Sequence, residues 1–124
     1  MLFLYGRILK GFRVVNQVSN HEKLYSFCMA EFLQWYETVV GKAYGSLGMG
    51  INSRKLEGLY ERLPHFGESL MAMSQGKFVP VPGGMLIKNA DGFLLGAAGV
   101  SGDTVDNDEM ACIAGIESAG LIAE

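Results

Sequence analysis

The sequence is poor in the residues that build metal, redox and disulfide sites. Its 124 residues include two cysteines, Cys28 and Cys112, which lie far apart and outside any CxxC or Cys/His spacing. This excludes a zinc motif and a disulfide framework, and we expect two buried, reduced thiols. Histidine is equally scarce, at two residues. No Ser-His-Asp set is visible.

Positive charge is scarce as well. Ten Lys+Arg against thirteen Asp+Glu give a net charge of −3, without a basic run. This argues against nucleic acid, whose binding needs clustered cations. The apolar start Met1–Tyr5 is too short for an exported leader or a membrane span, and its basic residues follow it rather than precede it. We therefore expect a cytoplasmic protein with no nucleic-acid or membrane partner.

Apolar residues, by contrast, are abundant. They make up 49% of the chain. A chain of this length forms one domain, residues 1–124, with a single core, and it cannot bury all of that surface. We expect part of it to lie in a subunit interface, and hence a homo-oligomer.

The first half of the chain predicts short strands followed by helices. Residues 1–18 favour one or two short strands. Ser19-Asn20 is a helix-start signal, and apolar residues recur every three or four positions from there to about Leu47. This predicts one long amphipathic helix from His21, with Gly41 as the point where a break would fall. Asn52-Ser53 caps a second helix.

A third helix starts at Pro64 and ends at Gln75-Gly76. Lys77–Val81 then alternates around prolines, which suits an edge strand because proline cannot donate to a central ladder. Two strands follow, Met85–Lys88 and Phe93–Val100, and the Asp-Gly pair between them supplies the positive φ of a tight hairpin.

The second hairpin strand is nearly bare of side chains at Gly96–Gly99, so another backbone or a helix must approach it closely, and a packed helix is the usual partner. Asp103-Thr104 caps the last helix, and Gly120 stands where a C-terminal αL residue belongs. The apolar face of that helix is predicted to comprise Val105, Cys112, Ile113 and Ile116.

Several motifs together resemble one family. Gly41-Lys-Ala-Tyr44 and Leu47-Gly-Met-Gly50 resemble its central helix and the exit from it. Val81-Pro-Gly-Gly84, Gly99-Val-Ser-Gly-Asp-Thr104 and Asp108-Glu109 resemble its signature. The family is the GlcG/HbpS-like haem-binding domains, related to the C-terminal domain of PduO-type corrinoid adenosyltransferases. The resemblance covers about residues 37–121. Residues 1–36 lack the alanine-rich first helix and the Val-Val-Asp-x-Gly-Gly-x-Leu hairpin of the family's opening.

The resemblance implies an α/β (α+β) domain of three layers, profilin-like, in which a central antiparallel sheet of about five strands is flanked by helices. It also implies a bacterial small-molecule-binding domain whose ligand is haem or a related tetrapyrrole. The alternative is a non-catalytic, oligomeric assembly or accessory domain of a metabolic pathway with no cofactor. An enzyme is less favoured than either.

Haem iron needs a His, Met, Cys or Tyr directed into an apolar slot. His21 and His65 are the candidate metal ligands, and the alternative for each is a partly exposed helix-start residue. The family's haem-ligating histidine lies on the missing first helix and does not transfer to His21 by position. The seven methionines could line a tetrapyrrole pocket, but they are more typical of core packing.

Two segments next to strand ends, Pro82–Gly84 and Ser101–Thr104, are candidates for ligand binding. The segment Ser101–Thr104 opens a helix whose free N–H groups could hold a propionate or phosphate. The acidic residues at this helix start would repel an anion. The favoured alternative is that the two segments cap the helix and form tight turns. The acidic cluster Asp106, Asp108 and Glu109 lacks a general-acid partner and does not support a paired-carboxylate enzyme. The candidate ligand-binding residues are Gly83, Gly84, Ser101, Gly102, Asp103 and Thr104.

Overall fold

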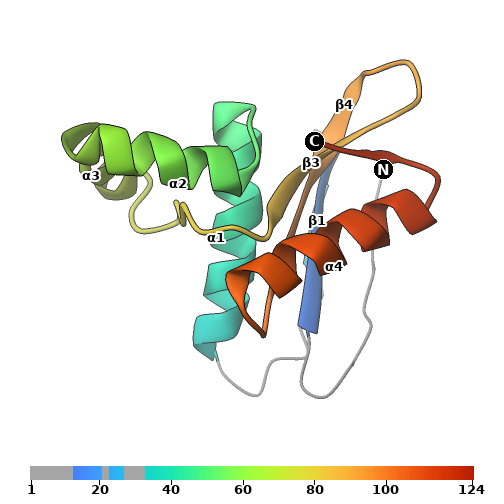
Figure 1. The fold of residues 1–124 in the computed structure, drawn as a ribbon, viewed down its shortest axis with the longest axis horizontal. Coiled ribbons are helices and arrows are strands. Elements are labelled where there is room, and N and C mark those ends of the chain that lie inside the picture. Colours follow the sequence, from blue (N-terminus) through green and yellow to red (C-terminus); the bar gives the residue numbers. More distant parts are fainter. Residues whose placement is uncertain (1–12, 21–22, 27–32) are drawn as a thin grey trace.

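A computed structural model describes residues 13–20, 23–26 and 33–124, with side chains from residue 37 onwards. The strands form one antiparallel sheet in the order β2-β1-β4-β3-β5, which confirms the predicted mixed α/β class (Figure 1). The elements in chain order are β1 (Arg13–Asn20), β2 (Lys23–Ser26), α1 (Leu33–Met49), α2 (Ser53–Arg62), α3 (Pro64–Met73), β3 (Gly84–Lys88), β4 (Leu94–Ser101), α4 (Val105–Ser118) and β5 (Ile122–Ala123).

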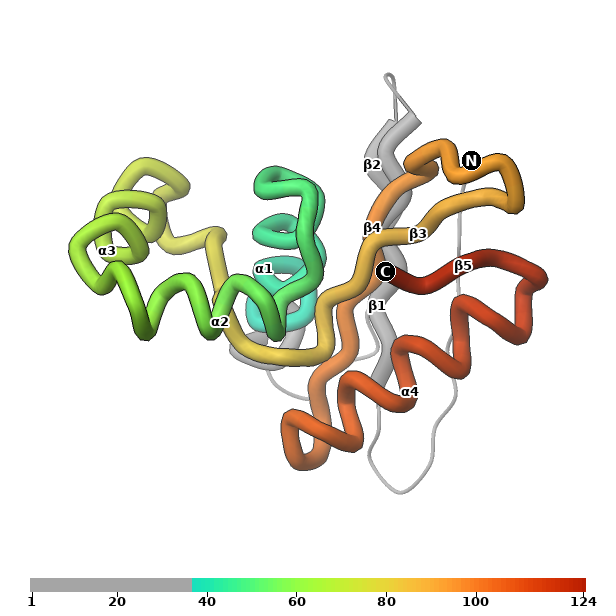
Figure 2. The backbone as a smooth tube through the Cα atoms, turned by 45° about the horizontal axis from the view of Figure 1, so that its top comes forward, coloured from blue at the N-terminus to red at the C-terminus, as the bar shows by residue number. Residues whose placement is uncertain are grey.

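The sheet separates two apolar layers, because successive side chains of a strand point to opposite faces. In β3, Ile87 packs in a cluster with Cys112 of α4. Its neighbour Leu86 packs with Ala43 of α1. Helix α1 therefore covers one face and α4 the other (Figures 1 and 2). Helix α2 packs against α1 and meets β3 at its first residue, Ser53, whereas α3 lies away from the sheet.

Helix α1 lies very close to the sheet at the bare segment of β4. A Cβ atom at Gly99 would overlap the carbonyl oxygen of Val39, which confirms the predicted close approach of a helix. Gly41 has a similar role on another side of α1, since a Cβ atom there would lie 2.9 Å from the carbonyl oxygen of Lys77. The helix runs through Gly41 without the break considered from the sequence.

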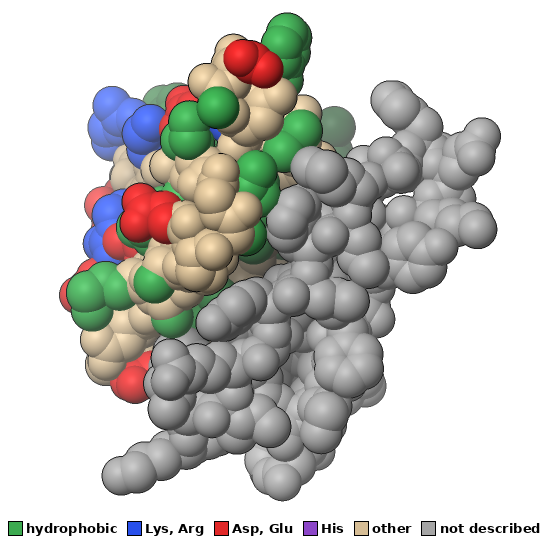
Figure 3. Space-filling model, turned by 90° about the vertical axis from the view of Figure 1, so that its right-hand side faces the viewer, with side chains coloured by type: hydrophobic (Ala, Val, Ile, Leu, Met, Phe, Trp, Pro, Cys, Tyr) green, Lys and Arg blue, Asp and Glu red, His purple; other side chains and the backbone are tan. Residues whose placement is uncertain are grey.

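The long helix predicted from His21 is wrong at its start. Lys23–Ser26 forms β2 and pairs with β1, with Tyr25 opposite Val18. Helix α1 begins at Leu33. Over so short a run, the apolar residues between positions 24 and 28 fit both a helix and a strand. Pairing with β1 makes Lys23–Ser26 a strand. The expected strands of residues 1–18 are represented by β1. Residues 1–12, His21 and Cys28 lie outside the described residues (grey in Figure 3).

The edge strand predicted for Lys77–Val81 is also wrong. This segment connects α3 to β3 without joining the sheet. Phe78 is buried, and the Val79 N–H donates to the carbonyl oxygen of Gly41 at 3.3 Å. Pro80 and Pro82 have no N–H group, so a ladder could not extend through them. The edge beside β3 is taken instead by β5, which the sequence did not predict.

The predicted turn and cap chemistry is confirmed in the second half of the chain. Gly92 has a φ of 83°, and its N–H donates to the carbonyl oxygen of Asn89 at 3.0 Å. Gly120 has a φ of 74° after the end of α4. The side chain of Asn52 accepts from the Lys55 N–H at 3.0 Å and caps α2.

Among the helices of the described residues, none is long and apolar enough to span a bilayer.

Candidate functional site

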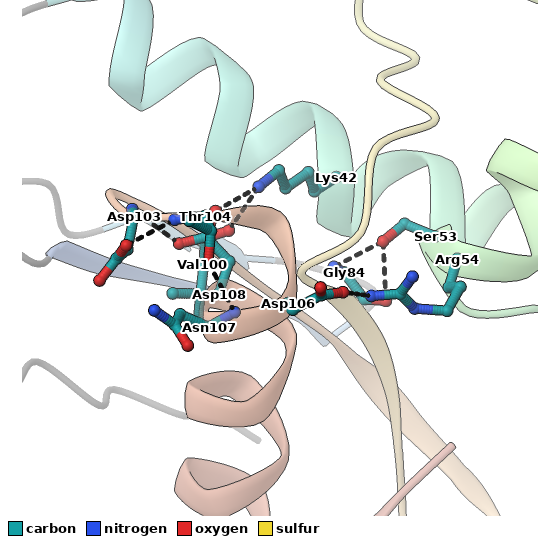
Figure 4. A network of polar contacts seen from close by, with 10 residues as sticks. All are labelled: Lys42, Ser53, Arg54, Gly84, Val100, Asp103, Thr104, Asp106, Asn107 and Asp108. Carbon is teal, nitrogen blue, oxygen red and sulfur yellow. Dashed lines mark hydrogen bonds and ion pairs between the residues drawn. The ribbon is translucent and has the colours of Figure 1, made fainter.

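A buried ion pair joins helices that lie on opposite faces of the sheet. Lys42 of α1 is 1% exposed, and its Nζ donates to the carbonyl oxygen of Val100 at 2.8 Å and to Oδ2 of Asp108 at 2.9 Å (Figure 4). Asp108 lies in the first turn of α4 and is equally buried. Because an unpaired charge in the interior is costly, each partner requires the other.

Two glycines before and at the start of β3 lie against this pair and against the backbone of α1. Gly83 has a φ of 113°, and a Cβ atom there would lie 2.5 Å from the carbonyl oxygen of Val100 and 3.0 Å from Nζ of Lys42. At Gly84 a Cβ atom would overlap the Lys42 carbonyl oxygen. The hydroxyl of Ser53 accepts from the Gly84 N–H at 2.7 Å and donates to the Gly84 carbonyl at 3.2 Å. The contacts of both glycines are therefore internal.

Three amide groups at or just before the start of α4 donate to side chains of the protein itself. The Asn107 N–H donates to Oγ1 of Thr104 at 3.4 Å, and the Thr104 N–H donates to Oδ1 of Asp103 at 2.6 Å. The Asp103 N–H donates to Oδ1 of Asp108 at 3.0 Å. These are capping contacts, which were the favoured alternative to anion binding at this helix end.

Ser101 is the last residue of β4, where it pairs with Arg13, and Gly102 follows it in the bend before α4. The structure thus brings the six candidate ligand-binding residues to one end of the sheet, around the Lys42–Asp108 pair. Their role in binding a ligand stays a prediction.

The acidic residues near the start of α4 are neutralised by two cations. Arg54 of α2 donates to Oε2 of Glu109 at 2.6 Å and pairs with Asp106 through its Nη2. Hydrogen bonds to Glu109 and Asp106 raise the pKa of Arg54. Lys42 neutralises the third carboxylate. Within the described part of the chain, no group of three or more His, Cys, Asp or Glu residues could hold a metal ion.

The candidate metal ligand His65 does not lie in an apolar slot. It is the second residue of α3, its side chain is fully exposed, and its Nδ1 is 3.7 Å from Oε2 of Glu68. Haem ligation requires hydrophobic walls around the axial imidazole, and the described residues provide none around this fully exposed side chain. His65 therefore does not fit the part of an axial ligand in this structure. His21 lies outside the described residues.

Cys112 is a buried free thiol in the layer between α4 and the sheet. Burial raises the pKa of this thiol to about 12. The thiolate is the form that attacks electrophiles and binds metals, and at neutral pH this raised pKa holds Cys112 as the neutral thiol.

In a Cys28→Ser variant, we expect Cys112 to resist iodoacetamide at neutral pH in the native protein and to react when guanidinium unfolds it. The neutral thiol is unreactive, and burial blocks the reagent. Mass spectrometry of the quenched protein would measure the labelled fraction. Labelling of the native protein at the rate of the unfolded chain would contradict the buried placement.

Sequence reasoning missed Lys42, although a signal for it was present. Lys42 lies at helical spacing between two buried residues of α1, Val39 and Ser46. An ionisable residue on the buried face of a helix requires a buried partner of opposite charge. The first turn of the last helix supplied that partner, Asp108. Ser46 is also fully buried, and its Oγ has no hydrogen-bond partner among the described residues.

Comparison with known proteins gives a family and a fold. A family model described as haem degrading protein, HbpS-like, matches residues 14–117. This match begins inside β1, earlier than the resemblance drawn from the motifs, which began near residue 37. The crystal structure of a PduOC:heme complex has the same fold, with a TM-score of 0.72 and 24% sequence identity over 89% of this chain and 80% of that chain. No curated protein matches the sequence.

Proposed function

This chain belongs to the HbpS-like family, and on that premise we propose that it is a small-molecule-binding domain whose ligand is haem or a related tetrapyrrole. The observation that carries the proposal is the family match over residues 14–117, which includes most of the folded domain. The fold shared with PduOC, whose crystal structure is a complex with heme, supports it.

A haem site needs apolar walls and an axial ligand to the redox-active iron that the cofactor supplies. Among the described residues, Tyr44 and Leu47 lie three positions apart on α1 and both are partly exposed, so one side of this helix presents apolar surface beside a phenol. His65 has no such surroundings. We propose an imidazole ligand at His21, with Tyr44, Tyr60 or a methionine as the next candidates.

Titration of the protein with hemin is expected to produce a Soret band that saturates. The His65→Ala curve should superimpose on that of the parent, because a fully exposed imidazole offers iron no apolar slot. The His21→Ala variant should bind more weakly, with a shifted band. Unchanged spectra in both variants would contradict histidine ligation and direct attention to Tyr44. If the parent shows no saturable band, the haem proposal fails and the domain is an assembly module without a cofactor.

We also propose that the domain forms homo-oligomers in the cytoplasm, and helix α3 supports this. Its only buried residue is Gly67, where a Cβ atom would overlap the Tyr60 ring of α2. Phe66, Met71 and Met73 of the same helix are exposed. An exposed apolar helix favours a protein contact.

Light scattering at micromolar concentration is expected to give a mass above that of one chain. Met73→Glu should lower that mass, because Met73 is 80% exposed and a charge there would be buried in the contact. Met110→Glu on α4 is the matched control, since Met110 is also exposed but lies on another helix. A parent protein that is wholly monomeric would refute self-association.

A further inference from the structure

We propose that Lys42 couples the two faces of the sheet, so that α1 and the first turn of α4 open as one unit. Lys42 belongs to α1, which covers one face of the sheet, and its ammonium group donates to Asp108 of α4, which covers the other face (Figures 1 and 4). Its ammonium group also holds Val100, near the end of β4. One buried cation thus links α1, β4 and α4.

The sheet is built to let this side chain pass. Gly84 of β3 lies opposite Gly99 of β4, so this end of the sheet lacks side chains on both strands. Gly83, the residue before Gly84, lies against the Lys42–Asp108 pair. A Cβ atom added there would lie 3.0 Å from Nζ of Lys42 and 3.1 Å from Cβ of Asp108. The bare backbone at Gly84 and Gly99 lets the backbone of α1 lie against the sheet, and the bare backbone at Gly83 leaves room for the end of the lysine side chain.

The contacts continue from Lys42 into the turn before α4. Asp108 accepts from Lys42 with one carboxylate oxygen and from the Asp103 N–H with the other. If α1 moved away from this end of the sheet, Asp108 would be left as a buried, unpaired charge, which is strongly unfavourable. The low-energy path is for the turn of Asp103 and Asp108 to move together with α1.

Arg54 makes a second link to the same turn, of a different kind. Its side chain is 42% exposed, and its partners Asp106 and Glu109 are 73% and 18% exposed, so water reaches the guanidinium group and one of the two carboxylates. Water can replace these contacts when they break, so this link permits independent movement. Lys42 and Arg54 both bind carboxylates near the start of α4, the first in the interior and the second at the surface, so their variants can be compared directly.

Native-state hydrogen exchange tests the coupling. In the parent protein, the amides of α1 around Ala43 and those of Asp103 and Asp108 should open with the same denaturant dependence. In Lys42→Met, exchange at Asp103 and Asp108 should rise between about a hundredfold and a few thousandfold relative to the α1 amides, the size expected when a buried ion pair loses one member. Arg54→Met should leave that ratio unchanged.

If Lys42→Met does not fold, Asp108→Asn gives the same test, because asparagine keeps the shape of the side chain and an acceptor for the Asp103 N–H. Separate opening of α1 and the α4 turn in the parent would overturn the coupling. An equal acceleration of all amides in the variant would also overturn it, since the pair would then stabilise the fold without linking its two faces.

Discussion

Replacing Lys42 with methionine is expected to lower the free energy of unfolding by about 3–5 kcal/mol. Methionine keeps the length and the apolar part of the side chain but removes the ammonium group. The carbonyl oxygen of Val100 and the carboxylate of Asp108 would lose a donor that lies 2.8 Å and 2.9 Å away, respectively. Urea denaturation followed by circular dichroism would measure the change.

Two companion variants separate a buried charge from an exposed one. Arg54→Met also removes a cation that binds α4, but its side chain is 42% exposed, so the cost should stay below about 1 kcal/mol and should shrink in salt. The double variant Lys42→Met/Asp108→Asn should recover part of the loss, because no buried charge is left unpaired. A Lys42→Met midpoint equal to that of Arg54→Met would contradict the buried pair.

The parts of the fold that the sequence predicts correctly depend on local chemistry. Asn52 caps α2, Pro64 begins α3, and the Asp-Gly turn closes the β3–β4 hairpin, each through contacts within four residues. Thr104 caps α4 in the same way. Such signals act over one turn of chain, so the sequence around them contains all the information that is needed.

The parts that were wrong depend on partners far away in the sequence. The segment Lys23–Ser26 has helical spacing, yet it is a strand because β1 lies beside it and β1 in turn pairs with β4. Lys77–Val81 has the alternation of a strand but no N–H groups at its prolines. The short strand β5 exists because β3 leaves an edge free for Ile122 and Ala123. Tertiary pairing outweighs local pattern in all three.

The candidate site shows the same division. Gly83, Gly84, Asp103 and Thr104 could be selected from the sequence because glycine pairs and helix caps mark special backbone positions. Their common neighbour, the ion pair, could not be found in this way, since Lys42 and Asp108 are 66 residues apart. The lack of a side chain at Gly83 makes room for a lysine that is distant in sequence, and the part of these glycines in binding a ligand stays a prediction.

Substitution of Gly83 with alanine is expected to destabilise the protein by about 2–6 kcal/mol, the sum of two costs. At a φ of 113°, alanine is strained by about 1–3 kcal/mol. Its Cβ atom would also lie 2.5 Å from the carbonyl oxygen of Val100, a backbone atom that cannot rotate away, and this overpacking adds about 1–3 kcal/mol. Thermal denaturation would show the loss as a lower midpoint.

Three other glycines separate the two costs. Gly92 has a φ of 83° with nothing within 4 Å of a Cβ atom, so Gly92→Ala should show the strain alone. Gly84→Ala should show the crowding alone, against the Lys42 carbonyl oxygen. Gly58, in α2, has neither problem, and alanine there should stabilise the helix by about 0.5–1 kcal/mol. If Gly83→Ala cost no more than Gly92→Ala, the space beside Lys42 would be larger than the structure allows, and the packing of the lysine between the layers would be refuted.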